Sequence, residues 1–369
     1  MTGAMYAAVS GLKSHMNKLN VIGNNIANVN TYGYKSARTT FQESLYTSVR
    51  SGSNGTDTVG GMNPAQIGYG CNIGTIDLDM STKNYVPTGV GLDCMISGDG
   101  FFLAGGKQVI KDDGTLTAVP NAKDLNLTRV GNFTFDSQGY LVDGYGSVIY
   151  GFVTCAAAED GGKNTQAGPT NDNKPLVSTQ LVPIRLPISN TKEDANAKPP
   201  LVVGQAIYPG VDDNGNNVYP TEGDTISANL DSISIDGKTG KITAVNNADG
   251  KTIVVGYIAL AKVANPNGVT HLQGPYYRAG EGAGSCAPAS IGDVLKGQNL
   301  NNAEDDDANA QKIFGTGGTE LITNGLESSG TDIATEFSEM ISTQRGYQAN
   351  TRIITVTDTM LEELVNIKR

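Results

Sequence analysis

Apolar residues at heptad spacing mark both ends of this 369-residue sequence, and they constrain its fold more than any other feature. In residues 1–28 the apolar side chains recur at intervals of four and three up to the slot at Gly23, and in residues 331–369 they recur at intervals of seven. This spacing places them along one face of an α-helix. The first stripe consists of Met5, Val9, Leu12, Met16, Leu19 and Ile26, and the second of Ile333, Met340, Tyr347, Ile354 and Leu361, flanked by Phe337.

Two such helices are expected to pair as a coiled coil. One possibility is a helical hairpin that closes a globular domain. A lone pair, however, buries too few apolar side chains to offset the backbone entropy lost when both helices become ordered. The pair therefore needs further partners, either a body domain or other copies of the chain.

The chain between the two helices is predicted to be mainly β. Residues 132–143 alternate apolar and polar side chains around a Ser-Gln-Gly turn, residues 232–245 predict a hairpin across a Gly-rich loop, and residues 253–263 predict a long strand. The 47 glycines and the low fraction of charged residues, 17%, agree with a turn-rich β body. These strands have little spare apolar surface for two long helices, which favours packing between molecules.

Several classes of function are excluded by composition. The net charge is −11 and no Lys/Arg cluster is present, so we expect no nucleic-acid partner. The N-terminus lacks an apolar run of signal-peptide length, and residues 253–263 are too short to span a bilayer, so the chain is not expected to be membrane-inserted. We expect no metal site, no cofactor and no catalytic triad, because His15 and His271 are the only histidines and the cysteines are widely spaced. These cysteines are Cys71, Cys94, Cys155 and Cys286.

The predicted fold class is a multidomain, mainly β protein with two β-rich domains nested within the paired terminal helices. The chain runs outward through successive layers and returns. The predicted parts are a helical coiled-coil domain at 1–28 and 331–369, an irregular linker with a short hairpin at 29–70, an inner β domain at 71–152 and 254–330, and an outer inserted β domain at 153–253.

Five segments resemble, in chain order, the signature regions of bacterial flagellar rod and hook proteins. They are residues 10–46, 60–70, 88–102, 129–152 and 318–369, which together cover roughly half of the chain. The resemblance implies a structural subunit of the extracellular flagellum, exported by the flagellar type III apparatus without a cleaved signal peptide. It further implies self-assembly into a hollow helical tube, with the terminal segments in an inner coiled-coil layer. The implied partners are copies of the chain, distal rod proteins, hook–filament junction proteins and the hook cap.

Within this family, the region 153–285 favours a hook protein, because it reads as an inserted β domain that shorter rod proteins lack. A hook subunit acts as a flexible joint that transmits torque, and the alternative is a distal rod subunit, a stiff driveshaft. A secreted adhesin or carbohydrate-active β protein is a remote alternative that leaves the heptads unexplained. We therefore expect no enzymatic activity.

Amides are concentrated in "NNIANVNTYGYK" at residues 24–35, where the first helix is expected to end. Asparagine tolerates left-handed geometry and bonds to nearby backbone, so these residues could be helix-capping and turn residues. Alternatively, amides that both donate and accept suit contacts between subunits. On that hypothesis the linker interface consists of Asn24, Asn25, Asn28, Asn30 and Tyr34.

Overall fold

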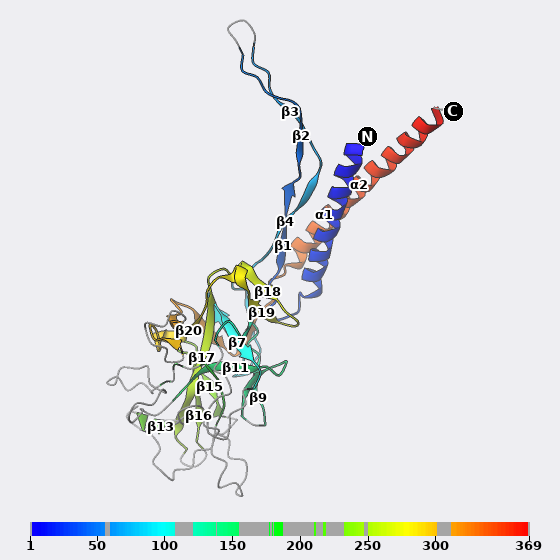
Figure 1. Ribbon diagram of the computed structural model, residues 1–369. Helices are drawn as coiled ribbons and strands as arrows, with labels where there is room; N and C mark the ends of the chain where they lie inside the picture. The colour runs from blue at the N-terminus through cyan, green and yellow to red at the C-terminus, as the bar shows by residue number, and fades with distance from the viewer. Residues whose placement is uncertain are drawn as a thin grey trace. The chain divides into compact units, whose positions relative to one another are not determined.

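The computed structural model divides the chain into two compact units (Figure 1). The helical unit comprises Met1–Asp79 and Ser329–Arg369, and the β unit comprises Met80–Ser328. The structure describes residues 2–55, 60–107, 121–137, 139–154, 177, 179, 181–186, 210–211, 217–218, 232–246, 250–300 and 311–367.

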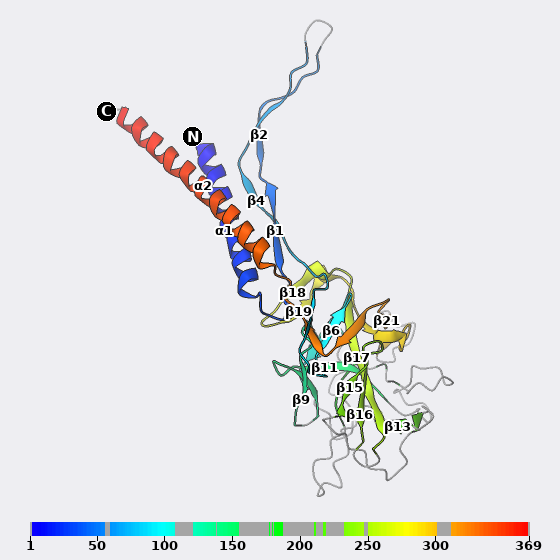
Figure 2. The ribbon, with the colours of Figure 1, turned by 180° about the vertical axis from the view of Figure 1, so that it is seen from behind.

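The helical unit contains the two helices that the heptad stripes predict. Helix α1 spans Thr2–Ala27 and helix α2 spans Ile333–Ile367, and they lie side by side in opposite directions (Figures 1 and 2). Asp332 caps the start of α2, because its Oδ1 accepts a hydrogen bond from the backbone N–H of Ala334 at 3.1 Å. Neither helix is long and apolar enough to cross a membrane.

A two-stranded ribbon packs on a second side of α1. Strand β1 (Ala37–Glu43) pairs antiparallel with β4 (Cys71–Leu78), and β2 (Tyr46–Arg50) pairs antiparallel with β3 (Ala65–Gly68). The prediction for residues 29–70 is an irregular linker with a short hairpin, and the structure has three strands there, of which β2 and β3 pair as a hairpin and β1 is additional. Threonine, isoleucine and aromatic residues at alternating positions favour this extended geometry. The ribbon supplies α1 with contacts that a lone helix pair lacks.

The β unit is organised around the long strand β17 (Thr252–Val263), which belongs to a sheet of fifteen described strands. Its antiparallel neighbours are β7 (Phe101–Gly105), β11 (Val148–Val153), β16 (Lys241–Val245), β20 (Cys286–Ser290) and β13 (Gly210–Val211). The sheet is completed by β8 (Asn126–Thr128), β9 (Phe133–Phe135), β10 (Leu141–Asp143), β12 (Val182–Pro183), β14 (Asn217–Val218), β15 (Ser234–Ile235), β18 (Val269–His271), β19 (Tyr276–Ala279) and β21 (Phe314–Gly315).

The described residues of the β unit also form two short antiparallel pairs and three single-turn helices. Strand β5 (Tyr85–Pro87) pairs with β23 (Gly325–Glu327), and β6 (Cys94–Ser97) pairs with β22 (Glu320–Thr323). The 3₁₀ turns are η2 (Pro266–Gly268), η3 (Glu281–Ala283) and η4 (Ile291–Asp293). Strands from the beginning and end of the unit therefore lie next to each other.

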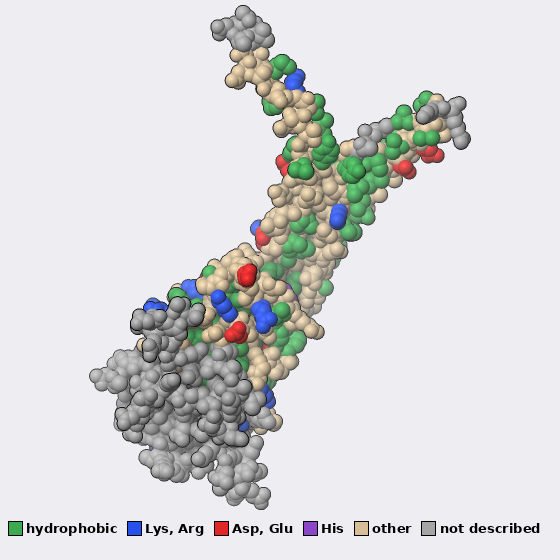
Figure 3. Space-filling view, viewed as in Figure 1, with side chains coloured by type: hydrophobic (Ala, Val, Ile, Leu, Met, Phe, Trp, Pro, Cys, Tyr) green, Lys and Arg blue, Asp and Glu red, His purple; other side chains and the backbone are tan. Residues whose placement is uncertain are grey.

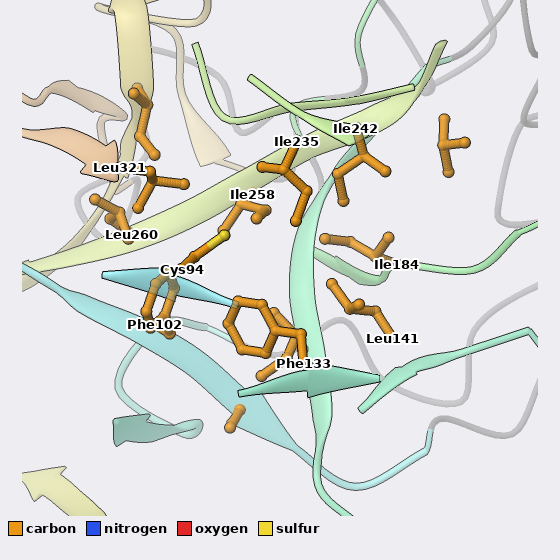
Figure 4. Packing of buried hydrophobic residues seen from close by; sticks show 14 of the residues in the cluster. Cys94, Phe102, Phe133, Leu141, Ile184, Ile235, Ile242, Ile258, Leu260 and Leu321 are labelled. Carbon is orange, nitrogen blue, oxygen red and sulfur yellow. The ribbon is translucent and has the colours of Figure 1, made fainter. Parts of the chain in front are cut away.

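The core of the β unit draws on residues from the whole length of the unit (Figure 4). Phe102 and Phe133 meet edge to face with ring centroids 4.9 Å apart. Ile184, Ile235 and Ile242, from the range predicted as an outer domain, are buried in the same cluster. The described residues of 153–253 thus share a sheet and a core with the strands on either side. The predicted separate outer domain otherwise falls on residues outside the described ranges, such as 155–176.

A buried ion pair lies where β23 leaves the β unit. Glu327 Oε2 is 3.9 Å from Nη1 of Arg129, and the two side chains are 1% and 2% exposed. Glu327 Oε1 also accepts a hydrogen bond from the backbone N–H of Lys83 at 2.8 Å, and Arg129 Nη2 donates to the carbonyl of Gly98 at 2.9 Å. The pair joins β23 to segments more than 200 residues away in sequence.

Removal of the Glu327 carboxylate is expected to destabilise the β unit strongly. Glu327→Ala leaves the Arg129 guanidinium buried without its counter-ion, which costs roughly 3–5 kcal/mol. Glu320→Ala on neighbouring β22, where the side chain is exposed, is the control and is expected to change stability by no more than about 0.5 kcal/mol. Denaturant unfolding of the full chain measures both, and equal midpoints for the two variants would contradict a structural role for the pair.

Candidate interaction surface

Two of the six residues of the apolar stripe on α1 are exposed to solvent. Val9 is 50% exposed and Met16 is 45% exposed. Met5, Leu12, Leu19 and Ile26 are half-buried. The fully buried positions of α1 are instead Ala8, Gly11, Ser14, Ile22 and Asn25. The predicted stripe is therefore only partly covered inside its own chain, and the most deeply buried positions of α1 lie beside it.

On α2 the predicted stripe divides in the same way. Ile333, Phe337 and Leu361 are exposed, at 45%, 49% and 37% respectively, whereas Met340, Tyr347 and Ile354 are half-buried. The two buried residues of α2 are threonines, Thr343 and Thr357. Further exposed apolar residues of α2 are Ile341, Ile353, Val356, Met360, Leu364, Val365 and Ile367.

The ribbon adds an apolar surface that the sequence analysis missed. Leu45, Val49 and Ile67 are 80%, 65% and 58% exposed, and Tyr46 and Met62 are also exposed. Figure 3 shows hydrophobic side chains along the ribbon and along the helix pair. The alternation in "SLYTSVR" at 44–50 is the signal that could have revealed this surface. Apolar area of this kind marks an interaction surface.

Polar pairs hold α1 and α2 together. Lys18 Nζ lies 3.0 Å from Oε2 of Glu339, and Asn25 Nδ2 donates to Oε1 of Glu336 at 2.8 Å. Burial raises the pKa of Glu336, and the hydrogen bond from Asn25 partly opposes that shift. The inner seam of the pair is thus polar and closely spaced, while apolar side chains face outward.

The amide-rich segment forms a hydrogen-bonded cluster within the chain. Asn25, only 2% exposed, donates to the carbonyl of Ala37 at 2.9 Å and accepts from the backbone N–H of Ala37 and from the Tyr34 hydroxyl at 3.0 and 3.1 Å. Asn24 Nδ2 donates to the same hydroxyl at 3.0 Å. Asn28 Nδ2 donates to the carbonyl of Asn24 at 2.9 Å and so caps α1. Asn30 is exposed.

This cluster joins the end of α1 to the start of β1 and to α2. The hydroxyl of Thr331 donates to the carbonyl of Asn25 at 3.1 Å, and the backbone N–H of Gly330 donates to the carbonyl of Tyr34 at 2.8 Å. The capping and turn interpretation accounts for these bonds. The intersubunit role of the linker residues stays a prediction.

Other chemistry is sparse among the described residues. Burial raises the pKa of the Cys94 thiol to about 12 and that of Cys286 to about 11, so neither is a thiolate at neutral pH. Cys71 is half-buried, and Cys155 lies outside the described residues. No cluster of three or more potential metal ligands occurs in the part of the chain that the structure describes. A pocket of about 300 Å³ in the β unit is lined by Gly98–Gly100, Leu260–Lys262, Ala289 and Thr316–Thr319, without histidine or cysteine.

Comparison with known proteins relates the two ends of the chain to one family. Residues 5–35 match the family model described as flagella basal body rod protein, and residues 323–367 match the C-terminal model of the flagellar basal body rod FlgEFG proteins. The chain is 32% identical over 371 residues to the flagellar basal-body rod protein FlgG of Bacillus subtilis, with all of both chains covered. This chain belongs to the flagellar rod and hook protein family.

Flagellar hook proteins are similar to the chain over comparable lengths. The flagellar hook protein FlgE of Borreliella burgdorferi is 28% identical over 461 residues, with both chains fully covered. That of Rhizobium meliloti is 28% identical over 440 residues, covering all of this chain and 99% of its own. The two family models coincide with α1 plus the amide cluster and with β23 plus α2. The family signature thus lies mainly in the helical unit, and the family is one of structural flagellar subunits.

Acidification is expected to weaken the helical unit of this flagellar family member through His15. The ring packs against Phe41, with centroids 5.5 Å apart, and its charged neighbours are Lys18 and, through Lys18, Glu339. Burial, aided by Lys18, lowers the pKa of His15 below its ordinary value of 6.5. The unfolded chain therefore takes up the proton first as pH falls below 6.5, and the free energy of unfolding decreases.

The measurement is denaturant unfolding of the full chain at several values between about pH 7 and pH 5, with far-UV circular dichroism as the probe. His15→Gln removes the titrating ring but keeps Glu336, whose raised pKa acts in the opposite direction. The decrease in stability is expected to be smaller in this variant than in the unsubstituted chain. Parallel pH curves would show that His15 is not the responsible group.

Loss of the Asn25 side chain is expected to loosen the amide cluster. Asn25→Ala leaves the Ala37 backbone and the Tyr34 hydroxyl without their buried partner, at a cost of roughly 1–3 kcal/mol. Asn30→Ala, at an exposed position of the same segment, is the matched control and is expected to stay within about 0.5 kcal/mol. Hydrogen exchange of the amides of 25–37 reports the difference, and unchanged protection in the Asn25 variant would contradict it.

Proposed function

We propose that the chain is a structural subunit of the bacterial flagellar hook. Copies assemble into a hollow, curved tube that acts as a flexible joint and transmits torque from the motor to the filament. The observation that supports this function is the apolar surface of the helical unit, in which Val9, Met16 and Phe337 are each about half exposed on folded helices.

Burial of that surface by neighbouring copies supplies the driving force for assembly. Full burial of one Val, Met or Phe side chain contributes roughly 1.5–3 kcal/mol. Contacts between different patches on identical subunits propagate into a helical polymer when the rotation between them does not close a ring. On this proposal the predicted stripes, from Met5 to Ile26 and from Ile333 to Leu361, are shared between intrachain and intersubunit packing.

The relatives named as hook proteins in Borreliella burgdorferi and Rhizobium meliloti support the hook assignment. The second candidate is a distal rod subunit. It is favoured by the Bacillus subtilis protein named FlgG, whose alignment of 371 residues has nearly the length of this chain. Length alone therefore does not separate hook from rod.

The proposal also places the chain outside the cell, exported by the flagellar type III apparatus without a cleaved signal peptide. Its further partners would be the distal rod, the hook–filament junction proteins and the hook cap. The function requires no catalysis. Resemblance to the family supports these assignments, and each can be tested by pull-down with the corresponding flagellar protein.

Electron microscopy of the concentrated full chain tests the function. Tubes of regular helical symmetry are expected, curved for a hook and straight for a rod. Met16→Asp places a charge on the exposed stripe and is expected to lower the assembled fraction at least about tenfold, the equivalent of 1.4 kcal/mol. Asn20→Asp, which adds the same charge at an exposed polar position of α1, is the control and is expected to assemble. A chain that stays monomeric at all concentrations would overturn the proposal.

We further propose that the linker residues contact neighbouring copies through the side chains that remain exposed. Asn24 and Asn30 are exposed, Asn28 and Tyr34 are half-buried, and Asn25 would act indirectly by holding the cluster in shape. Asn30→Ala is expected to reduce tube formation without changing monomer stability. Normal tubes from this variant would remove Asn30 from the interface.

A further inference from the structure

The apolar stripe of α2 does not by itself define how α2 aligns with α1. Ile333, Met340, Tyr347, Ile354 and Leu361 repeat every seven residues, so a shift of one heptad places a similar residue at each position. In coiled coils, residues that break the apolar repeat usually select one register. The seam between α1 and α2 contains two glycines, Gly11 and Gly346, which lie beside the apolar stripes.

Each helix receives one side chain of the other over a glycine. Gly11 of α1 is buried, and a Cβ added there would lie 2.7 Å from Nδ2 and 3.3 Å from Cγ of Asn350. Gly346 of α2 faces the ring of His15, and a Cβ added there would lie 2.8 Å from both Cε1 and Nε2. Real Cβ atoms essentially never make contacts this short, so the neighbouring side chain would have to move.

The two contacts are reciprocal. On α1 the glycine precedes the inserted side chain by four residues, Gly11 to His15, and on α2 it does the same, Gly346 to Asn350. Residues four apart lie one turn apart on the same face of a helix. Two antiparallel helices with this pattern match at both contacts at once.

We infer that Gly11 and Gly346 are positioning residues that select a single register of α1 against α2. They do so because each leaves room for one side chain of the other helix. The ion pair of Lys18 with Glu339 and the hydrogen bond of Asn25 with Glu336 continue the same register toward the end of α1.

A slip of one turn, about 6 Å, breaks the match in either direction. In one direction Gly11 comes to lie opposite Gly346, which leaves a void. In the other direction His15 comes to lie opposite Asn350, and neither side chain then has a glycine opposite it to provide space. Both outcomes are unfavourable, since voids and overpacking each destabilise helix contacts.

The register decides which exposed apolar residues of α1 lie level with which exposed apolar residues of α2. This inference rests on the proposed function, because only an assembling subunit needs the same outward stripe on every copy. The inference goes beyond that function because it names the two residues, Gly11 and Gly346, that align the stripe.

The test uses alanine substitutions at three helical glycines of the full chain. Gly→Ala at any of them raises helix propensity by roughly 1 kcal/mol. Gly23 has open space at its Cβ position, with no atom within 4 Å, so Gly23→Ala reports that gain alone. Gly11→Ala and Gly346→Ala add the clash. Two double variants restore the space, Gly11→Ala/Asn350→Ala and Gly346→Ala/His15→Ala. Together with the single variants Asn350→Ala and His15→Ala they complete two double-mutant cycles.

The fraction of chain in tubes, measured by sedimentation and electron microscopy, is the first readout. Gly346→Ala is expected to lower it at least about fivefold relative to Gly23→Ala, the lower end of overpacking costs. The effect of Gly11→Ala is expected to be smaller, because the Asn350 amide can rotate away more easily than a ring held against Phe41. Each double variant is expected to recover most of the loss. Assembly of Gly346→Ala at the level of Gly23→Ala, or doubles no better than the singles, would overturn the inference.

Hydrogen exchange of the α1 amides in the full chain is the second readout and separates this inference from the proposed function. If the unsubstituted chain forms no tubes, the proposed function fails, yet slow exchange in α1 that Gly346→Ala accelerates and Gly346→Ala/His15→Ala restores would still support the register. Equal exchange in all variants would overturn the inference. So would an α1 whose amides are unprotected in both the monomer and the tubes.

Discussion

The structure of the helical unit depends on a seam between two helices that is built from small and polar side chains. Coiled coils usually bury their apolar stripe, but here the residues that meet across the seam are Gly11, His15, Lys18 and Asn25 of α1 and Asn350, Gly346, Glu339 and Glu336 of α2. Close approach, an ion pair and hydrogen bonds hold the pair. The apolar side chains are thereby left for contacts outside it. A chain with this arrangement is ordered enough to present a defined surface, and that surface is incomplete until other molecules cover it.

Much of the fold could be predicted from periodicity. The heptad stripes predict helices at 1–28 and 331–369, and the structure has them at Thr2–Ala27 and Ile333–Ile367. The alternation at 132–143 and 232–245 predicts two hairpins, which appear as the β9–β10 and β15–β16 pairs. These patterns depend on neighbours close in sequence, and such local signals survive without knowledge of the fold.

Predictions that depend on contacts distant in sequence were less complete. Periodicity shows that Val9 and Met16 share a helix face, but not that the face turned inward is that of Ala8 and Gly11. The β1–β4 pair of the ribbon was not predicted, because its two strands pair across about thirty intervening residues. In the same way, Ile184 and Ile235 look like parts of a separate domain in sequence, whereas the sheet of β17 draws them into a common core. Register, facing and shared cores arise from three-dimensional packing that one sequence does not display.

The paired strands β5 and β23 have a mechanical consequence. The chain enters the β unit through one and leaves through the other, and Tyr85 pairs with Glu327 at the ends where they do so. Glu327 is in turn anchored to Arg129 in the interior. A force or torque transmitted through the backbone is therefore shared by two hydrogen-bonded strands. A single peptide linker could rotate about its own bonds, whereas these two strands restrain each other.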